Sequence, residues 1–514
     1  MRRETSIFRI WAVVITMLTI FVFSASAQGA PFKGGSLKII SVTGDVRSLG
    51  PSSEARIIWQ LWYAQPAIET LLKFNDQGLP SPHLAESWKI ANDQKSITFS
   101  LRKGVKFHDG TDFDAEAVKF NLEAFLKGGR MDLEGISSVD ALDKHSVRLN
   151  LNPFSNVLMT NLAHLAGMIS SPTAIKKMGL EEFGRNPVGT GPFKLKNWRR
   201  DLSIKFERFD DYWQKGKPFV DEIEFLHIKD PMTAVASFMA GDGHALYGVP
   251  APQAIEWRKS GLYNIRTPRQ SHSVATVGDS ANPDSPFAKL KVRQAISHAI
   301  DGKAINDGVL LGFNDLTNQF SGPKSWAYNK ETVGYAYDPA KAKKLLAEAG
   351  YPQGFKTTLW WLNVRSEPAV AAAIQAFLKE VGIQAEVQLI EMSSWVDLCR
   401  KGWKNGMVVF ACAQTVPDDL RNLMYFIEKY KFWKSMESPK EINDLIFKAL
   451  REPDMNTKVA LTQEINRLLT DKYCLVNFMM ITNGICAVKK EVHDSGLFEI
   501  ALTQFNPADV YLSK

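Results

Sequence analysis

The chain has 514 residues, of which 45% are hydrophobic and 23% are charged, and its formal net charge is +7 at pH 7. This length suggests about three folding units, and the composition is typical of soluble globular proteins. Basic and acidic residues are interspersed along the chain, so the charge pattern does not indicate a nucleic-acid partner.

The start of the chain has the pattern of a secretory signal. Arg2, Arg3 and Arg9 provide a positive segment, residues 10–23 form an apolar run, and Ala25-Ser26-Ala27 is a small-residue cleavage site. The alternative is a membrane anchor, but the run is shorter than the ~20 residues of a spanning helix. The sequence therefore predicts export, with cleavage near this site and a periplasmic mature protein.

A strand and a helix are predicted next. Residues 37–42 predict a strand that ends at Thr43 and Gly44. Ile57–Leu72 is a mixed apolar stretch that predicts a helix. It carries large aromatic residues that could pack in the core or contact a ligand, and we expect core packing. These residues are Trp59, Trp62 and Tyr63.

The stretch from Phe99 to Thr111 contains the clearest local pattern. Apolar and polar residues alternate over 97–102, which predicts a half-buried strand. Gly104 and Gly110 mark turns, because glycine adopts positive φ freely. Asp114 is then in position to cap a helix with an apolar face.

Three further segments carry local signals. Asn186–Phe193 contains Gly-x-Gly, but Pro192 and a strand pattern follow it, which excludes a dinucleotide-binding fingerprint. Residues 292–301 predict a helix. Tyr337–Gly350 predicts another, with Asp338 as the N-cap, proline at the first position and glycine just beyond the end.

A βαβ unit is predicted in the second half of the chain. Thr357–Trp361 and Ala385–Ile390 read as strands, and Pro368–Val381 between them reads as a helix. Such a connection makes the two strands parallel. Met407–Cys412 predicts the next buried strand. Because ligands bind beyond the carboxyl ends of such strands, the loops at that edge are candidate binding loops.

Two of these loops contain candidate ligand-binding residues. Arg365 precedes a helix N-terminus, which favours anions, and its guanidinium can hold a carboxylate through two hydrogen bonds. The alternative is a solvated loop arginine. Gln414, Thr415 and Asp418 lie in the loop that follows the last predicted strand.

In this order, the segments resemble the markers of the large extracytoplasmic solute-binding proteins of family 5, which serve peptide and nickel ABC importers. The run from Leu84 to Thr111 is similar to "LAESW … F.LRKGVKFHDG", Asn186–Phe193 to "NPVGTGPF", and residues 292–301 to "VRQAL..AID". The resemblance extends from about Leu37 to Val488. One departure is Gly241–His244, where the family usually has "GEID".

The resemblance implies an α/β fold of the two-lobed periplasmic-binding-protein type. Lobe I is expected over residues 32–268, with an inserted subdomain near 56–185. Lobe II is expected over 269–486, and residues 487–514 return to lobe I. Two strands would join the lobes, so that a hinge closes them over a solute in the cleft between them.

The resemblance also bears on the ligand. In peptide-binding relatives the loop reads roughly Asp-Tyr-Pro-Asp-Pro, and its first Asp holds the α-ammonium of the peptide; the matching position here is Thr415. A hydroxyl cannot replace a carboxylate as the partner of a buried ammonium. The cleft is therefore expected to suit a ligand with a free acid and no buried α-amine. Trp395 resembles an aromatic residue that walls the site, with core packing as its alternative. Thr43, Gly44, His272 and Trp361 complete the predicted ligand-binding set.

The implied function is the solute-binding component of an ABC importer. As a monomer, the protein would capture a peptide or peptide-like solute and deliver it to an inner-membrane permease. A nickel chelate, an oligosaccharide or an opine-like acid are alternative solutes. The sequence has no Gly-x-Ser-x-Gly elbow, Walker A loop or His-Glu-x-x-His motif, so no enzyme activity is expected, and an exported hydrolase is the alternative from another class.

Neither a metal nor a cofactor is expected. The chain has no Cys-x-x-Cys pair, and its nine histidines are scattered. Its four cysteines are Cys399, Cys412, Cys474 and Cys486. Export permits disulfides, and four cysteines allow three complete pairings, between which the sequence does not choose.

Overall fold

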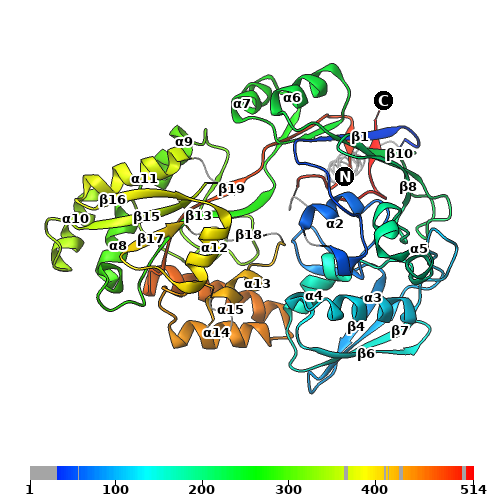
Figure 1. Cartoon of the computed structure of the whole chain (residues 1–514), viewed down its shortest axis with the longest axis horizontal. Helices are drawn as coiled ribbons and strands as arrows, with labels where there is room; N and C mark the ends of the chain where they lie inside the picture. Colours follow the sequence, from blue (N-terminus) through cyan, green and yellow to red (C-terminus); the bar gives the residue numbers. More distant parts are fainter. Residues whose placement is uncertain are drawn as a thin grey trace, which may run out of the picture.

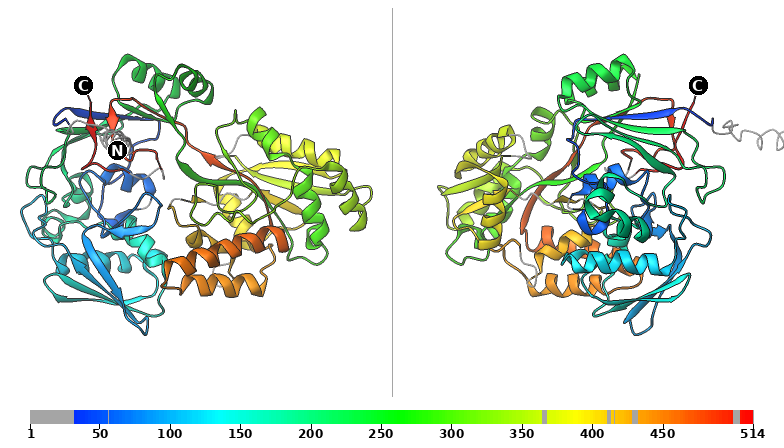
Figure 2. Two further views of the ribbon diagram at one scale, coloured as in Figure 1. Left: turned by 180° about the vertical axis from the view of Figure 1, so that it is seen from behind. Right: turned by 45° about the vertical axis from the view of Figure 1, so that its right-hand side comes forward.

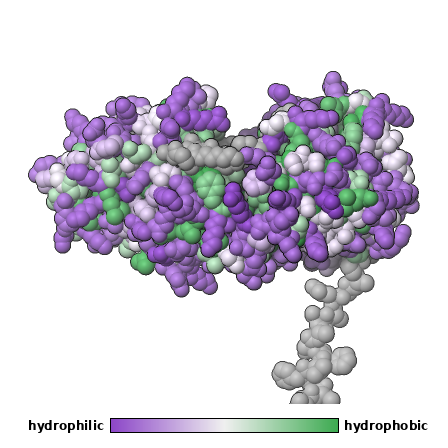
Figure 3. All heavy atoms as spheres, turned by 90° about the horizontal axis from the view of Figure 1, so that it is seen from below, coloured by the Kyte–Doolittle hydropathy of each residue, from purple (hydrophilic) through white to green (hydrophobic). Residues whose placement is uncertain are grey.

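The computed structural model describes residues 32–55, 57–363, 368–409, 413–414, 416–427, 432–499 and 505–513. Two α/β bodies lie side by side along its long axis (Figure 1). We call the body that holds the N-terminal part of the chain lobe I and the other body lobe II. Figure 3 shows them from below as two masses with a largely hydrophilic surface.

Lobe I is built on a seven-stranded sheet in the order β12-β20-β11-β1-β10-β9-β8. β1 pairs in parallel with β10 and β11, and the remaining pairs are antiparallel. Aromatic side chains fill its core: Trp62 meets Phe225 with ring centroids 5.1 Å apart, and both side chains are fully buried. The strands are β1 (Ser36–Ser41), β8 (Phe193–Arg199), β9 (Ser203–Arg208), β10 (Glu222–His227), β11 (Ala245–Tyr247), β12 (Asn264–Arg266) and β20 (Cys486–Val488).

Helix α2 (Ile58–Ala64) is shorter than the helix predicted over Ile57–Leu72. Pro66 follows closely, and proline cannot continue a helix because its ring clashes with the carbonyl of residue i−4 and it lacks an N–H. Ile68 and Leu71 are nevertheless fully buried. The apolar pattern beyond Ala64 therefore came from a buried connection rather than from a helix.

The loop from Asn186 to Phe193 crosses closely over the backbone at Pro66 and Ala67. A Cβ atom on Gly189 would lie 2.1 Å from the carbonyl oxygen of Ala67, and one on Gly191 would lie 2.5 Å from that of Pro66. The N–H of Gly191 donates to the carbonyl of Ala67 at 3.0 Å. The two glycines therefore permit backbone packing in lobe I.

A four-stranded antiparallel sheet in the order β4-β5-β7-β6 and helix α3 form the subdomain of lobe I. Gly104 (φ 73°) and Gly110 (φ 84°) make the predicted turns. Asp114 accepts a hydrogen bond from the N–H of Ala117 at 2.9 Å and caps α3, as predicted. The elements are β4 (Ala85–Ile90), β5 (Ser96–Leu101), α3 (Ala115–Lys127), η2 (Met131–Leu133), β6 (Ile136–Asp143), β7 (Ser146–Leu151), α4 (Val157–Leu162) and η3 (Leu165–Gly167).

Smaller elements complete lobe I. Helices α6 and α7 lie above the sheet in Figure 1, near the boundary with lobe II. The bounds are η1 (Ser52–Glu54), β2 (Leu72–Phe74), β3 (Pro80–Pro82), α5 (Pro172–Arg185), α6 (Pro231–Ala240), α7 (Ala251–Ser260), β21 (Val492–His493) and β22 (Tyr511–Leu512).

Lobe II is built on a second seven-stranded sheet, in the order β14-β19-β13-β17-β15-β16, with β18 paired to β13. β15 is parallel to β16 and β17, and helix α11 connects β15 to β16, which confirms the predicted βαβ unit. The strands are β13 (Arg269–Gly278), β14 (Asp315–Leu316), β15 (Lys356–Leu362), β16 (Gln384–Ile390), β17 (Gly406–Val409), β18 (Ala413–Gln414) and β19 (Val476–Asn483).

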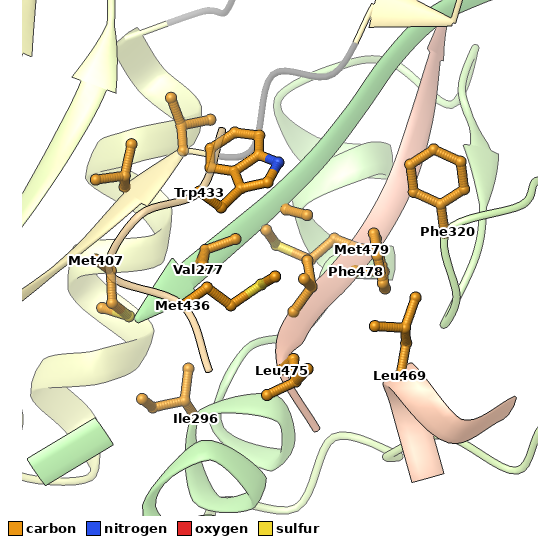
Figure 4. Close-up of a cluster of buried hydrophobic side chains, with 14 of the residues drawn as sticks. Val277, Ile296, Phe320, Met407, Trp433, Met436, Leu469, Leu475, Phe478 and Met479 are labelled. Carbon is orange, nitrogen blue, oxygen red and sulfur yellow. The ribbon is translucent and has the colours of Figure 1, made fainter. Parts of the chain in front are cut away.

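Helices cover this sheet and bury its side chains. Figure 4 shows part of the resulting core, in which Val277 and Met436 lie between Met407 and Phe478. Asp338 caps α10 by accepting from the N–H of Lys341 at 2.8 Å, as predicted. The helices are α8 (Leu290–Ala299), α9 (Gly302–Gly308), α10 (Pro339–Glu348), α11 (Pro368–Glu380), α12 (Met392–Lys401), α13 (Asp419–Leu423), α14 (Lys440–Leu450) and α15 (Met455–Arg467), with short turns η4 (Pro286–Ala288), η5 (Met424–Phe426) and η7 (Leu468–Lys472).

The chain crosses between the lobes twice. β12 of lobe I continues into β13 of lobe II through residues 267–268, and β19 returns to β20 through 484–485. β13 pairs with β19, and β12 pairs with β20, so the crossings lie next to each other (Figure 2). The chain re-enters the first sheet at Cys486, one residue before the predicted boundary.

Three cysteines lie within the described residues. Cys399, Cys474 and Cys486 are buried free thiols. Cys412 falls outside the described residues. No disulfide therefore joins any two of the three described cysteines.

Candidate functional site

One edge of the lobe II sheet gathers several of the predicted site positions. β15 and β17 are parallel, so their carboxyl ends lie at the same edge. β13 is antiparallel to β17, which brings the start of β13, just after the crossing from lobe I, to that edge. There Ser271 pairs with Gln414, and His272 pairs with Ala413. The backbone positions of His272 and Gln414 are thus neighbours at the boundary between the lobes.

Two of the predicted residues lie outside the described residues. Arg365 falls between Asn363 and Pro368, and Thr415 falls between β18 and Val416. The structure describes the residues at the ends of both loops. Leu362 ends β15, and Pro368 begins α11. Both loops therefore connect to the edge of the sheet where sequence analysis expected them.

The structure corrects the expectation for Trp361 and shows the alternative for Trp395. Trp361 is fully buried in the core of lobe II, because helices α11 and α12 both pack on β15. Trp395 is 5% exposed, and its indole N–H donates to the carbonyl of Val409 at 3.1 Å. Its ring also meets that of Trp433, with centroids 5.7 Å apart. Both tryptophans pack in the core rather than line an open cleft.

Asp418 is also committed to contacts within the protein. Its carboxylate accepts from Lys458 Nζ at 2.7 Å and from Thr160 Oγ1 at 2.5 Å, and it caps α13 through the N–H of Leu420 at 3.1 Å. Asp418 and Lys458 are buried. In this arrangement its oxygens bind a lysine of lobe II and a threonine of lobe I, and the ligand contact of Asp418 stays a prediction.

On lobe I, the carboxyl ends of β1 and β10 carry a polar cluster. Thr43 Oγ1 lies 2.8 Å from Tyr63 Oη and 2.6 Å from Ser41 Oγ. His227 Nε2 lies 3.6 Å from a carboxylate oxygen of Asp45. Burial raises the pKa of Tyr63 to about 12, so its hydroxyl keeps its proton at neutral pH. Burial also lowers the pKa of His227, although Asp45 acts in the opposite direction.

Thr43 and Gly44 therefore differ in what they offer a solute. Thr43 is half-buried, and its hydroxyl is already engaged with Ser41 and Tyr63. Gly44 is exposed in the loop after β1, which lies on the side of lobe I that faces lobe II (Figure 1). The Gly44 backbone is thus the accessible group at this end of β1.

Sequence analysis missed a buried carboxylate in lobe I. Glu69 accepts hydrogen bonds from Tyr212 Oη at 2.7 Å, Thr190 Oγ1 at 2.8 Å and Trp213 Nε1 at 3.0 Å, and its other contact is His83 Nε2 at 3.1 Å. Burial by itself would raise the pKa of this carboxyl, but His83 and the hydrogen bonds outweigh it and lower the pKa. Glu69 borders a cavity of about 100 Å³ inside lobe I. In the sequence, the only indication of this buried carboxylate was an acidic residue among apolar neighbours.

Two features are absent from the described residues. No group of three or more histidine, cysteine, aspartate or glutamate side chains within the described ranges is arranged to hold a metal ion. Among the helices of the described part of the chain, none is both long enough and apolar enough to cross a membrane.

Two α/β lobes joined by a pair of crossing strands define the class of two-lobed periplasmic binding proteins. The model of the bacterial extracellular solute-binding proteins, family 5 Middle, matches residues 80–433. The chain belongs to this family.

Individual relatives agree with this assignment. The glutathione-binding protein GsiB of Shigella flexneri is 32% identical over 409 residues, which cover 74% of this chain and 76% of GsiB. AgaA from A. tumefaciens R10, solved with agropinic acid, is 27% identical, with a TM-score of 0.72 and coverage of 93% of this chain and 99% of AgaA. HbpA2 from Haemophilus parasuis shares the fold at 22% identity, with a TM-score of 0.83 and coverage of 93% and 100%.

The family assignment gives the general function. The chain is an extracytoplasmic solute-binding protein that works as the solute-binding component of an ABC importer. Its relatives are solute-binding proteins rather than enzymes.

Proposed function

We propose that this protein captures a peptide-like acid in the cleft between its lobes and delivers it to a membrane permease. The observation that carries the proposal is the similarity to GsiB, at 32% identity over most of both chains. GsiB is named for glutathione, a tripeptide with two free carboxylates. AgaA, at 27% identity, holds agropinic acid. A free acid is the chemistry that these two ligands share.

The sequence at the edge of lobe II supports an acidic ligand. Arg365 belongs to the loop that opens helix α11, whose N-terminus favours an anion. Thr415 stands where peptide-binding relatives of this family carry an aspartate for the α-ammonium. We therefore infer that Arg365 binds a carboxylate of the solute and that no side chain at position 415 neutralises a buried amine. Gly44, His272 and Gln414 belong to the same proposed site.

The ligand charge gives the first prediction. We expect wild-type protein to bind an N-acetylated peptide or a non-peptide acid more tightly than the matched peptide with a free α-amine. Arg365→Ala should weaken the acidic ligand by roughly 30-fold or more, because removing one partner of a buried charged pair costs about 2–5 kcal/mol. Thr415→Asp should improve the binding of free α-amino peptides. Isothermal titration calorimetry on the wild type, Arg365→Ala and Thr415→Asp measures these affinities.

The control is Arg148→Ala, since Arg148 is an exposed arginine on β7 of the subdomain. It should leave the affinities unchanged. A wild-type preference for free-amine peptides, together with an Arg365→Ala variant of unchanged affinity, would falsify this account of the site. Mass spectrometry of the ligand that co-purifies with the protein distinguishes a peptide-like acid from an opine-like acid, the solute class that AgaA suggests.

We also propose that the exported protein is cleaved near Ala27 and acts as a monomer. The apolar run over 10–23 and the Ala25–Ala27 site support cleavage. We expect the mature native protein to begin near Gln28, which N-terminal sequencing measures. A mature chain that still contains Trp11 would contradict this prediction.

A further inference from the structure

The two lobes meet at a second place, away from the crossing strands. Helix α4 of lobe I lies against α13, α14 and α15 of lobe II at the lower edge of the molecule in Figure 1, whereas the crossing strands run through its upper part. We call this contact the α4 junction. It consists of residues 156–161 of lobe I and residues 418, 421, 449–452 and 458 of lobe II.

The α4 junction has an apolar centre. Val157 is 4% exposed and packs within the hydrophobic core of lobe II. The next apolar residues of the same helix, Leu158 and Leu162, pack within the core of the subdomain instead. One six-residue helix is thus shared between the cores of two lobes that are far apart in the sequence.

Asn156 of lobe I donates hydrogen bonds to carbonyl groups at the C-terminal end of α14 in lobe II. Its backbone N–H donates to the carbonyl of Leu450 at 2.8 Å, and its Nδ2 donates to the carbonyls of Ala449 at 2.5 Å and Glu452 at 2.9 Å. The last carbonyls of a helix have no partner within the helix and must be satisfied from outside. For α14 that partner comes from lobe I.

Charged groups surround this centre. Thr160 Oγ1 donates to Asp418, which is also paired with Lys458. Arg421 of lobe II donates to Asp132 Oδ1 at 2.8 Å and to Asn161 Oδ1 at 3.0 Å, both in lobe I. Burial would raise the pKa of Asp132, but Arg421 and then Arg130 outweigh it and lower the pKa, so this ion pair persists at neutral pH.

We propose that the α4 junction is a permanent second joint between the lobes, at which Asn156, Val157 and Thr160 act as positioning residues for solute capture. The crossing strands form one joint and the α4 junction forms the other, so the lobes turn about the line between them. Asp418 lies two residues beyond Val416 and is the N-cap of α13. The junction therefore holds the start of α13 against lobe I while the cleft opens and closes.

The space beside the junction allows such a motion. A pocket of about 650 Å³ adjoins it and is lined by residues of both lobes, among them Phe154, Asn161, Tyr425 and Arg451.

The first experiment needs no solute. Spin labels on Lys177→Cys of α5 and Lys343→Cys of α10, both exposed, report the distance between the lobes by double electron–electron resonance. The background carries Cys412→Ser, and burial raises the pKa of the thiols of Cys399, Cys474 and Cys486, which keeps them unreactive. We expect a single narrow distance distribution for the otherwise wild-type protein.

Val157→Asp should broaden this distribution. A carboxylate is expelled from apolar surroundings, so the ratio of docked to undocked protein should fall by about 100-fold or more. Lobe I should stay folded, because Val157 packs in the core of the other lobe. The matched control is Ser155→Asp, which puts the same charge two residues away on the pocket wall and should leave the distribution narrow.

A second variant keeps the test decisive if Val157→Asp does not fold. Asn156→Ala/Thr160→Val removes the polar contacts and should also broaden the distribution, whereas Thr160→Ser, which keeps the hydroxyl, should not. Thr357→Val is the matched control, because its hydroxyl donates to the carbonyl of Asn405 within lobe II. A narrow distribution in both junction variants, or equal broadening in the controls, overturns the proposal.

The second experiment asks whether the junction stays closed as the cleft closes. Ser155→Cys/Arg451→Cys joins the two sides through a short bismaleimide, since Asn156 and Leu450 share a backbone hydrogen bond. With glutathione as the probe, we expect the cross-linked protein to keep its affinity within about two-fold and to become more compact in small-angle scattering. Loss of binding or of compaction after cross-linking would show that the junction must open, and would overturn a permanent joint.

The cross-linking experiment rests on the proposed function, whereas the distance measurement does not. If the protein without the cross-link fails to bind glutathione, the proposed ligand class is in error, and the distance measurement still decides whether the α4 junction holds the lobes together.

Discussion

Lys458→Met is expected to lower the free energy of unfolding by about 3–5 kcal/mol. Lys458 is 1% exposed and Asp418 is 2% exposed, with 2.7 Å between Nζ and Oδ2. Methionine fills a similar volume but leaves the carboxylate without its cation, and an uncompensated buried charge is costly. Urea denaturation followed by circular dichroism measures the change.

The matched control is Lys440→Met. Lys440 pairs with Asp444 on the surface of α14, with both side chains largely exposed. Such pairs contribute little, so this variant should unfold at the wild-type urea concentration. Adding Asp418→Asn to Lys458→Met should recover part of the loss, because the two residues interact directly. Equal loss in both methionine variants would contradict the role given to the buried pair.

Gly189→Ala is expected to destabilise lobe I by about 1–3 kcal/mol or more, as overpacking does. The added Cβ would lie 2.1 Å from the carbonyl oxygen of Ala67 and 2.8 Å from the Cα of Ile68, and both are backbone atoms that cannot rotate away. The loop would have to lift off the connection that follows α2. Thermal unfolding measures the change.

Gly308→Ala is the control for this substitution. Gly308 ends α9, and a Cβ there would meet nothing within 4 Å. Alanine also has the higher helix propensity, so this variant should be neutral or slightly more stable. If the Gly189→Ala and Gly308→Ala variants have the same melting temperature, the loop adapts, and its close approach to the backbone at Ala67 does not limit stability.

Much of the fold could be predicted from local chemistry. The caps at Asp114 and Asp338, the turns at Gly104 and Gly110, and the parallel strands around α11 were all found where the sequence placed them. Each depends on neighbours within a few residues, or on a βαβ connection whose geometry leaves little choice. The family markers add the two-lobed architecture.

Predictions for single side chains were less successful. Trp361 and Trp395 are large and sit near the ends of elements that approach the cleft, yet both are buried in the core of lobe II. Burial depends on which helices cover a strand, and the sequence around a tryptophan does not state this. The charged partner of Asp418 is 40 residues away, and its hydroxyl partner is 258 residues away.

The sequence by itself determined the strands, the helix caps, the turns and the edge of the sheet at which a solute is expected, because periodicity, capping and turn chemistry act over short distances. Its resemblance to solute-binding family 5 supplied the class and the two lobes. Only the tertiary structure decided which polar groups are already satisfied. Asp418 accepts a hydrogen bond from Thr160, which is 258 residues away, and Glu69 accepts one from Tyr212, which is 143 residues away. The α4 junction likewise exists only because folding brings residues 156–160 against residues 418–458. The physical reason is that desolvation and charge pairing depend on neighbours in space, which no local pattern records.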